Sequence, residues 1–212
     1  MFLHNTRDSP IQSPKDLDGK TVGYPGIPLN EALLDTMVKA DDGDPEKVKT
    51  IDVGFELGSS IVNGKANAAI GAYINLEVPI LKHEGYNTRY FIPVDYGVPS
   101  FYELVFVTND ATWNDKEENI RAFWRAASKG YDFIKENHDE ALKVLLSNQD
   151  EANFPLVEKE SLGILLPKME SEGEAFGSQS APSWQETIVW LEVSGLIDEK
   201  PITEDIFINI VE

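Results

Sequence analysis

The sequence predicts an α/β protein in which one doubly wound lobe is followed by a mainly helical remainder. Strand-like and helix-like segments alternate between residues 20 and 93, which is typical of a mostly parallel sheet. Within this stretch, residues 66–70 form a run of small apolar side chains, the composition of a strand buried on both faces. From residue 115 onward, amphipathic helical patterns dominate and strand patterns are almost absent.

The predicted lobe begins with a short helical turn at 13–17, where Ser13 acts as the cap and Pro14 occupies the first position. Strands are expected at 20–24, 48–53, 66–70 and 89–93, and helices at 29–38, 56–63 and 76–83. The first of these helices places apolar residues on one face, namely Leu29, Leu33, Leu34, Met37 and Val38.

The second half of the chain begins with residues 101–108, the strongest strand pattern in the sequence. Helices are then expected at 115–137, 140–146, 158–166 and 183–193, followed by a last helix capped by Thr203. The apolar faces of these helices must be buried against other secondary-structure elements. They either form a bundle or cover a sheet whose strands lie outside this chain.

Composition excludes several classes of function. The 18 Lys and Arg residues are outnumbered by 37 Asp and Glu residues, and a formal charge of −19 makes nucleic acid an unsuitable partner. The absence of cysteine removes disulfides, thiolate metal sites and cysteine nucleophiles. Three histidines far apart in the sequence do not suggest a metal centre, and no cofactor is expected. No apolar run has the length of a membrane span, and the first residues do not have the pattern of a signal peptide.

The loop at 23–28 is the first candidate for ligand binding, because it follows a predicted parallel strand and leads into a helix. Its glycines allow close backbone approach, and the start of the helix offers N–H groups to a polar or anionic atom. The alternative is a plain strand–helix turn. The Gly-Lys-Ser/Thr signature of a phosphate loop is absent.

The loop at 71–77 is the second candidate. It combines the aromatic ring of Tyr73, the amide of Asn75 and the carboxylate of Glu77 within five residues. A carboxylate accepts hydrogen bonds from an amino-substituted heteroaromatic ring, on which a tyrosine stacks. The alternative is that Asn75 caps a helix and Glu77 lies in its first turn.

The third candidate is the bend at 95–103, which holds two tyrosines and equally suits a hinge or the edge of a core. The three loops are expected to converge on one edge of the sheet. The candidate ligand-binding residues are therefore Tyr24, Pro25, Gly26, Gly71, Tyr73, Asn75, Glu77, Tyr96, Gly97 and Tyr102. No Ser/His/Asp set or Gly-x-Ser-x-Gly elbow points to a catalytic residue.

Several segments resemble ABC-transporter solute-binding proteins. Residues 13–23 are similar to the start of the second lobe in that family. The Gly-Tyr-Pro-Gly-Ile-Pro loop, the 71–77 segment, the Tyr-Gly-Val-Pro segment at 96–104 and the Trp-rich stretch at 184–197 resemble the branch that binds pyrimidine precursors of thiamin. The similarity spans nearly the whole chain.

This resemblance implies a periplasmic-binding-protein type II fold, in which two lobes close on a small pyrimidine and deliver it to an ABC permease in the membrane. It implies that residues 14–99 form a complete lobe, whereas 1–13 and 100–212 form a partial second lobe whose sheet strands are missing. An unpaired strand at 101–108 would allow a dimer or a strand exchange. The implied location is extracytoplasmic, either periplasmic or lipid-anchored at the cell surface.

The resemblance leaves other functions open. Relatives bind sulfonate, nitrate or riboflavin, but the three loops contain no Arg or Lys, which favours an amino-bearing ring over an anion. Thiamin-pyrimidine synthases share the fold and resemble a cysteine-rich, histidine-dependent design, which the absence of cysteine disfavours. An effector-sensing domain of a transcription regulator is disfavoured by the charge and by the lack of a preceding helix-turn-helix.

Overall fold

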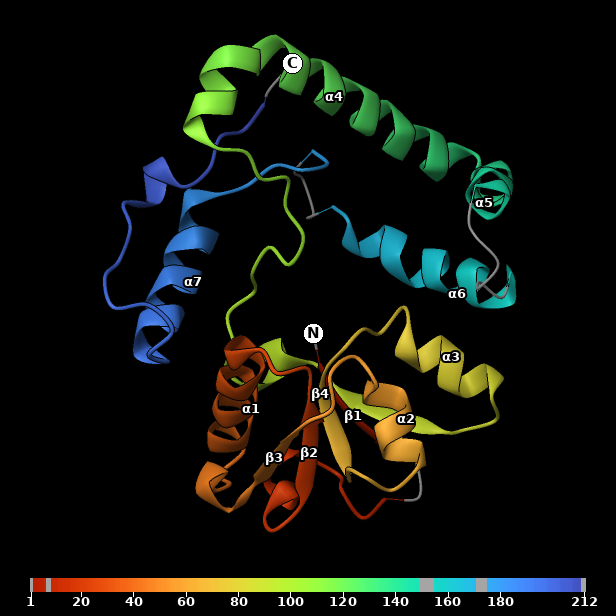
Figure 1. Ribbon diagram of the computed structural model, residues 1–212, viewed down its shortest axis with the longest axis vertical. Coiled ribbons are helices and arrows are strands. Elements are labelled where there is room, and N and C mark those ends of the chain that lie inside the picture. Colours follow the sequence, from red (N-terminus) through yellow and green to blue (C-terminus); the bar gives the residue numbers. More distant parts are fainter. Residues whose placement is uncertain (1, 7–8, 149–154, 171–174, 211–212) are drawn as a thin grey trace. The chain divides into compact units, whose positions relative to one another are not determined.

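The computed structural model describes residues 2–6, 9–148, 155–170 and 175–210 (Figure 1). The chain divides into two compact units. The first unit comprises residues 1–101 and 181–203, and the second unit comprises residues 102–180 and 204–212. Each unit is therefore made from two separate stretches of the sequence.

The first unit is built on a five-stranded sheet with the order β3-β2-β4-β1-β5. Strand β2 pairs in parallel with β3 and with β4, whereas β1 pairs antiparallel with both β4 and β5. The sheet is therefore mixed, with a parallel part of three strands. The strands are β1 (Phe2–Thr6), β2 (Thr21–Tyr24), β3 (Lys49–Asp52), β4 (Ala68–Ala72) and β5 (Thr88–Phe91).

Helices cover both faces of this sheet, as a doubly wound lobe requires (Figure 1). Ala68 and Ile70 of β4 join one core cluster with α1, while Ala69 and Ala72 join a second cluster with α2. Every residue of β4 is buried, which confirms the sequence prediction of a strand covered on both faces. The helices of this unit are α1 (Pro28–Ala40), α2 (Leu57–Val62), α3 (Glu77–His83) and α7 (Ala181–Val193).

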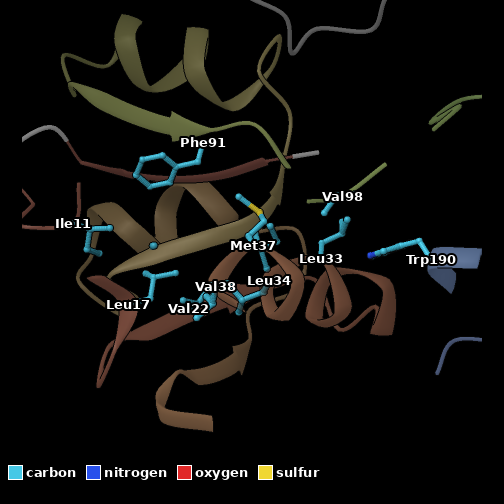
Figure 2. Packing of buried hydrophobic residues seen from close by; sticks show 12 residues of the cluster. Ile11, Leu17, Val22, Leu33, Leu34, Met37, Val38, Phe91, Val98 and Trp190 are labelled. Carbon is cyan, nitrogen blue, oxygen red and sulfur yellow. The ribbon is translucent and has the colours of Figure 1, made fainter. Parts of the chain in front are cut away.

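The larger core cluster is shown in Figure 2, where side chains of α1 lie against the sheet and Trp190 of α7 approaches them. Leu33 and Met37 of α1 are fully buried there. Burial of each such side chain contributes roughly 1.5–3 kcal/mol to folding. Trp190 also donates its indole N–H to the Thr36 hydroxyl over 3.1 Å. A helix near the end of the sequence thus completes the core of the first unit.

Strand β1 is an element that the sequence patterns do not predict. Residues 1–13 are grouped with the second lobe in the sequence-based division, but β1 lies between β4 and β5 in the sheet of the first unit. Ile11 is buried in the same core as α1. The physical reason is that β4 and β5 do not pair with each other, so β1 supplies the backbone partners that both strands need.

The second unit is helical. It contains α4 (Asp110–Glu136), α5 (His138–Ser147) and α6 (Pro155–Leu165). Helix α4 is capped by Asn109, whose side chain accepts the Thr112 N–H, and its dihedral angles are non-helical at Lys116. Trp124 and Tyr131 of α4 both stack on Phe176, with ring centroids 5.5 and 4.1 Å away. No described helix is long and apolar enough to cross a membrane.

Two predictions for this half of the chain are wrong. Residues 101–108 form no strand, and no described residue after β5 belongs to one. Leu104 and Val107 in this segment are 82% and 86% exposed. A strand needs a partner edge for its backbone, and the described part of the second unit offers none. The helix expected after Thr203 is only a single 3-10 turn over Thr203–Asp205, where the Thr203 hydroxyl donates to Gln185 instead of capping a longer helix.

Candidate functional site

The loops at 23–28 and 71–77 meet at one edge of the sheet. They follow β2 and β4, which are neighbouring parallel strands, so their carboxyl ends lie side by side. In open α/β sheets this edge is where ligands bind. Gly71 lies at the meeting point: a Cβ there would be 3.1 Å from Cδ of Pro25 and 3.0 Å from Oδ1 of Asn30. With a φ of +98°, Gly71 is required both for its conformation and for the space it leaves.

Asp52, at the end of β3, extends this edge and is a residue that sequence reasoning missed. A Cβ on Gly26 would lie 2.8 Å from Oδ2 of Asp52. The other carboxylate oxygen accepts the N–H of Gly54 over 2.8 Å. The first loop is thus packed against a carboxylate held by its own turn. An aspartate at the end of a strand with a glycine two residues later is the signal that could have identified it.

Glu77 is the first residue of α3, and its carboxylate folds back onto the loop before it. Its Oε2 accepts the backbone N–H of Tyr73 over 2.7 Å. Burial raises the pKa of the Glu77 carboxyl above its ordinary value, while the backbone N–H groups of Tyr73 and Glu77 partly offset that rise. Tyr73 is 37% exposed as a residue, and a tyrosine with part of its surface open can stack on a flat ligand.

The capping interpretation of this loop is partly correct. Glu77 does lie in the first turn of α3, as expected for an acidic residue near a helix N-terminus. The N-cap, however, is Leu76 and not Asn75, and no side chain caps this helix. Asn75 is half-buried in the loop. Its role as a cap is therefore wrong, and its role as a ligand contact stays a prediction.

In the third segment, Gly97 packs on the second half of α1. Gly97 has a φ of +80°, and a Cβ there would lie 3.3 Å from Cβ of Ala40 and 3.8 Å from Cγ2 of Thr36. The loops at 23–28 and 71–77 instead meet at the start of α1, ten residues before Ala40, which is about 15 Å along a helix. The meeting of the first two loops agrees with the expected convergence, whereas the part played by the third segment stays a prediction.

The remaining tyrosines of the candidate set have packing partners. Tyr24 is half-buried against the larger core cluster. Tyr96 packs on the same cluster and meets Phe91 edge to face, with centroids 6.0 Å apart. Burial, followed by the charges of Asp41 and Asp95, raises the pKa of the Tyr96 phenol. Tyr102 belongs to the second unit, where its hydroxyl accepts the Ser180 N–H over 2.8 Å.

Asn30 is a second residue that sequence reasoning missed. It lies in the first turn of α1, on the same face as the buried Leu33, Leu34 and Met37. Its side chain is buried, and neither Nδ2 nor Oδ1 has a hydrogen-bond partner among the described residues. An asparagine on an otherwise apolar helix face is the signal that could have found it. In the described part of the chain, no group of His, Cys, Asp and Glu side chains could hold a metal ion.

Comparison with known proteins shows the family of this chain. A family model described as NMT1/THI5 like matches residues 3–141. The formylaminopyrimidine-binding protein of Halalkalibacterium halodurans is 55% identical over 215 residues, covering all of this chain and 64% of the relative. A putative thiamine biosynthesis protein of Haemophilus influenzae is 32% identical over 71% of this chain and 48% of its own length.

A third relative, the 4-amino-5-hydroxymethyl-2-methylpyrimidine phosphate synthase of Legionella pneumophila, is 27% identical over 72% of this chain and 48% of its own length. The chain thus spans less than two thirds of the length of these relatives.

Solved structures show the same fold. The periplasmic aliphatic sulphonate-binding protein of Escherichia coli matches with a TM-score of 0.64 at 11% identity, over 94% of this chain and 62% of the other. The alkanesulfonate-binding protein of Xanthomonas axonopodis pv. citri, bound to MOPS, matches with a TM-score of 0.64 at 11% identity, over 95% and 66%. At such low identity the likeness concerns the fold alone. The predicted periplasmic-binding-protein-like α/β fold is confirmed.

Proposed function

The chain belongs to the NMT1/THI5-like family, and from this premise we propose that it is the solute-binding component of an ABC importer for a pyrimidine precursor of thiamin. The ligand is a formylamino- or hydroxymethyl-pyrimidine, held between the two lobes of the full-length protein. The relative at 55% identity carries the name formylaminopyrimidine-binding protein, which supports this ligand class.

The observation that carries the proposal is the pairing of Tyr73 and Glu77 at the carboxyl edge of the parallel strands. The partly exposed Tyr73 and the acceptor-only carboxylate of Glu77 sit within one turn, and that carboxylate accepts the backbone N–H of Tyr73 over 2.7 Å. An aminopyrimidine offers a flat ring to the first and an N–H donor to the second. Neither loop contains Arg or Lys, so a sulfonate or nitrate would find no cationic partner in them.

We assign the ligand contacts of this edge to seven residues of the two loops, namely Tyr24, Pro25, Gly26, Gly71, Tyr73, Asn75 and Glu77. Tyr96 and Gly97 also pack against the core and the second half of α1, and they stay predicted contacts. Tyr102 stays a predicted contact from the second unit.

A thiamin-pyrimidine synthase is the second candidate function, because one relative carries a synthase name. That relative is 27% identical, whereas the relative named as a binding protein is 55% identical. The chain also contains no cysteine, whereas the thiamin-pyrimidine synthases resemble a cysteine-rich design. Binding without turnover is therefore the function proposed.

The proposed transport function implies where the protein works and which membrane partner it has. A solute-binding component works outside the cytoplasm, either in the periplasm or anchored by lipid at the cell surface, and hands its ligand to a membrane permease. The 212-residue chain on its own further exposes an apolar segment at 104–107, which we propose drives self-association.

A thermal-shift panel on the full-length protein tests the ligand class. The panel contains 4-amino-5-hydroxymethyl-2-methylpyrimidine, its formylamino counterpart, riboflavin, an alkanesulfonate and nitrate. A ligand that binds only the folded protein raises the melting temperature in proportion to the logarithm of its concentration over Kd. The proposal expects stabilisation by the pyrimidines alone. Stabilisation by sulfonate or riboflavin without an effect of the pyrimidines would overturn it, and turnover of a pyrimidine precursor would favour the enzyme.

A further inference from the structure

Asn30 presents an unusual problem for the fold. The residue is 1% exposed, and both polar atoms of its carboxamide lack a hydrogen-bond partner among the described residues. A buried amide loses its bonds to water, and leaving it unpaired is costly. Leucine has nearly the same size and would join Leu33 and Leu34 on the same helix face without that cost. The amide is therefore expected to have a partner from outside the fold.

The position of the carboxamide indicates where that partner lies. Asn30 is in the first turn of α1, just after the loop at 23–28. If Gly71 carried a Cβ, the nearest atom to it would be Oδ1 of Asn30 at 3.0 Å, followed by Cδ of Pro25 at 3.1 Å. The unpaired amide thus lies where the two candidate ligand loops meet. The start of α1 adds to this, because its N-cap, Ile27, has no side-chain group that could cap the helix.

The hydrogen-bond donor and acceptor of a carboxamide indicate which chemical class of ligand could pair with it. Its planar edge carries one acceptor and one donor side by side. A 4-aminopyrimidine carries the complement, an exocyclic amino donor next to a ring-nitrogen acceptor, which is the pattern that asparagine pairs with on adenine. A sulfonate or a nitrate has acceptors only, and would leave Oδ1 of Asn30 unpaired.

We infer that Asn30 is a specificity-determining contact of the ligand site, with Oδ1 accepting from the exocyclic amino group and Nδ2 donating to the adjacent ring nitrogen of an aminopyrimidine. This inference rests on the proposed function. Because the structure buries both atoms, this inference requires the segment around Pro25 to move aside when the ligand binds. Glu77 and Asn30 then supply acceptors from two different elements, α3 and α1.

Asn30→Leu in the full-length protein tests this inference. The variant removes both polar atoms and keeps the size, so we expect a melting temperature equal to or above that of the wild type. Calorimetry with 4-amino-5-hydroxymethyl-2-methylpyrimidine should show a loss of affinity of about tenfold or more. With 5-hydroxymethyl-2-methylpyrimidine, which lacks the amino group, the same substitution should cost clearly less, because one of the two bonds is already absent.

The matched control is Thr187→Val, an isosteric change of another buried polar residue, whose hydroxyl donates to the Ser183 carbonyl over 2.9 Å. It should lower the melting temperature slightly and leave affinity unchanged. Asn30→Asp is the second variant: it keeps the size and the acceptors but loses the donor, so it should weaken binding as well, even if Asn30→Leu does not fold.

The outcomes separate this inference from the proposed function. If the wild type binds the aminopyrimidine and both Asn30 variants bind it equally well, the inference is wrong and the proposed function stands. A lower melting temperature of Asn30→Leu with unchanged affinity would show that a buried water satisfies the amide, and would also overturn it. If the wild type binds neither pyrimidine, the proposed function fails and the inference fails with it.

Discussion

The carboxylate of Glu77 accepts the backbone N–H of Tyr73 over 2.7 Å. One bond therefore fixes the loop of the candidate site that combines a partly exposed tyrosine with a half-buried carboxyl group. The same residue that holds the loop offers acceptor capacity to a ligand, because an ionised carboxylate accepts more than one hydrogen bond.

Glu77→Gln should separate these two roles. Glutamine retains an oxygen that accepts the Tyr73 N–H, so the melting temperature should be no lower than that of the wild type. It loses the charge that strengthens the bond to an amino group, which should cost about one to two decades in aminopyrimidine affinity. Calorimetry on the full-length protein measures this. The control is Glu84→Gln at the other end of α3, which should change nothing. Unaltered affinity in Glu77→Gln would make Glu77 a helix-start residue only.

Glu77 should also make stability depend on pH. Burial raises its pKa in the folded protein, so the folded state retains this proton to a higher pH than the unfolded chain does. The stabilising contribution is then present below the ordinary carboxyl pKa and is lost as pH rises through the raised value. Urea denaturation of wild type and Glu77→Gln over that pH range should show the variant gaining relative stability as pH increases. Parallel stability curves would contradict the raised pKa.

Gly71→Ala should destabilise the first unit and disturb the site. The new methyl group meets Pro25 and Asn30 at about 3 Å, and the φ of +98° is strained for alanine. Gly64→Ala is the matched control, because Gly64 has a φ of +69° with nothing within 4 Å of the added atom. Backbone strain of this kind costs on the order of 1–3 kcal/mol. Gly64→Ala should show that cost alone, and Gly71→Ala a larger one with weaker binding. Equal unfolding free energies would contradict the close packing of the two loops.

Trp190→Ala should show that α7 is an integral part of the first unit. The substitution removes a large buried side chain and the bond to the Thr36 hydroxyl. Loss of a buried tryptophan costs roughly 3–5 kcal/mol. Hydrogen exchange should show reduced protection in α1 as well as in α7. Unchanged protection of α1 would mean that α7 is not part of this core.

Leu104→Lys with Val107→Lys tests whether the exposed segment drives self-association of the 212-residue chain. Both side chains are more than four-fifths exposed and have no described partner strand, so the charges should not lower the melting temperature. They should shift sedimentation profiles toward the monomer, because charged side chains oppose apolar contacts between two copies of the chain. An oligomeric state that does not respond to these substitutions would overturn the proposed role of the segment.

Local patterns predicted most of the first unit. The alternation of β2, α1, β3, α2 and β4 is visible because each element has its own periodicity or small-residue run, and their bounds agree within a few residues. Strand β1 was not predicted, because the sequence Phe-Leu-His-Asn-Thr has no clear alternation of apolar and polar residues. This strand forms by pairing with β4 and β5, which lie far along the chain. The strand predicted at 101–108 is wrong because a clear local pattern there has no partner strand in the described residues. Its residues suit a strand, but propensity without a partner does not make one.

The sequence could also predict only part of the candidate site, because some of its contacts depend on how distant segments pack. Loops that follow neighbouring parallel strands meet by the topology of the sheet, so Pro25 and Gly71 could be expected to lie together. Gly97 could not be placed, because its position depends on how the chain after β5 packs on α1. Asn30 appears in the sequence as one polar residue in an apolar stripe, and only the structure shows that its amide has no partner among the described residues.

Calorimetric titration of the full-length protein with the formylamino derivative of 4-amino-5-aminomethyl-2-methylpyrimidine tests the central claim most directly. The account predicts saturable binding with one ligand per chain. The affinity should be at least about tenfold tighter than for an alkanesulfonate, because the pyrimidine matches the buried donor and acceptor of the Asn30 carboxamide and the sulfonate does not. Saturable binding of the sulfonate with no heat from the pyrimidine would contradict the account.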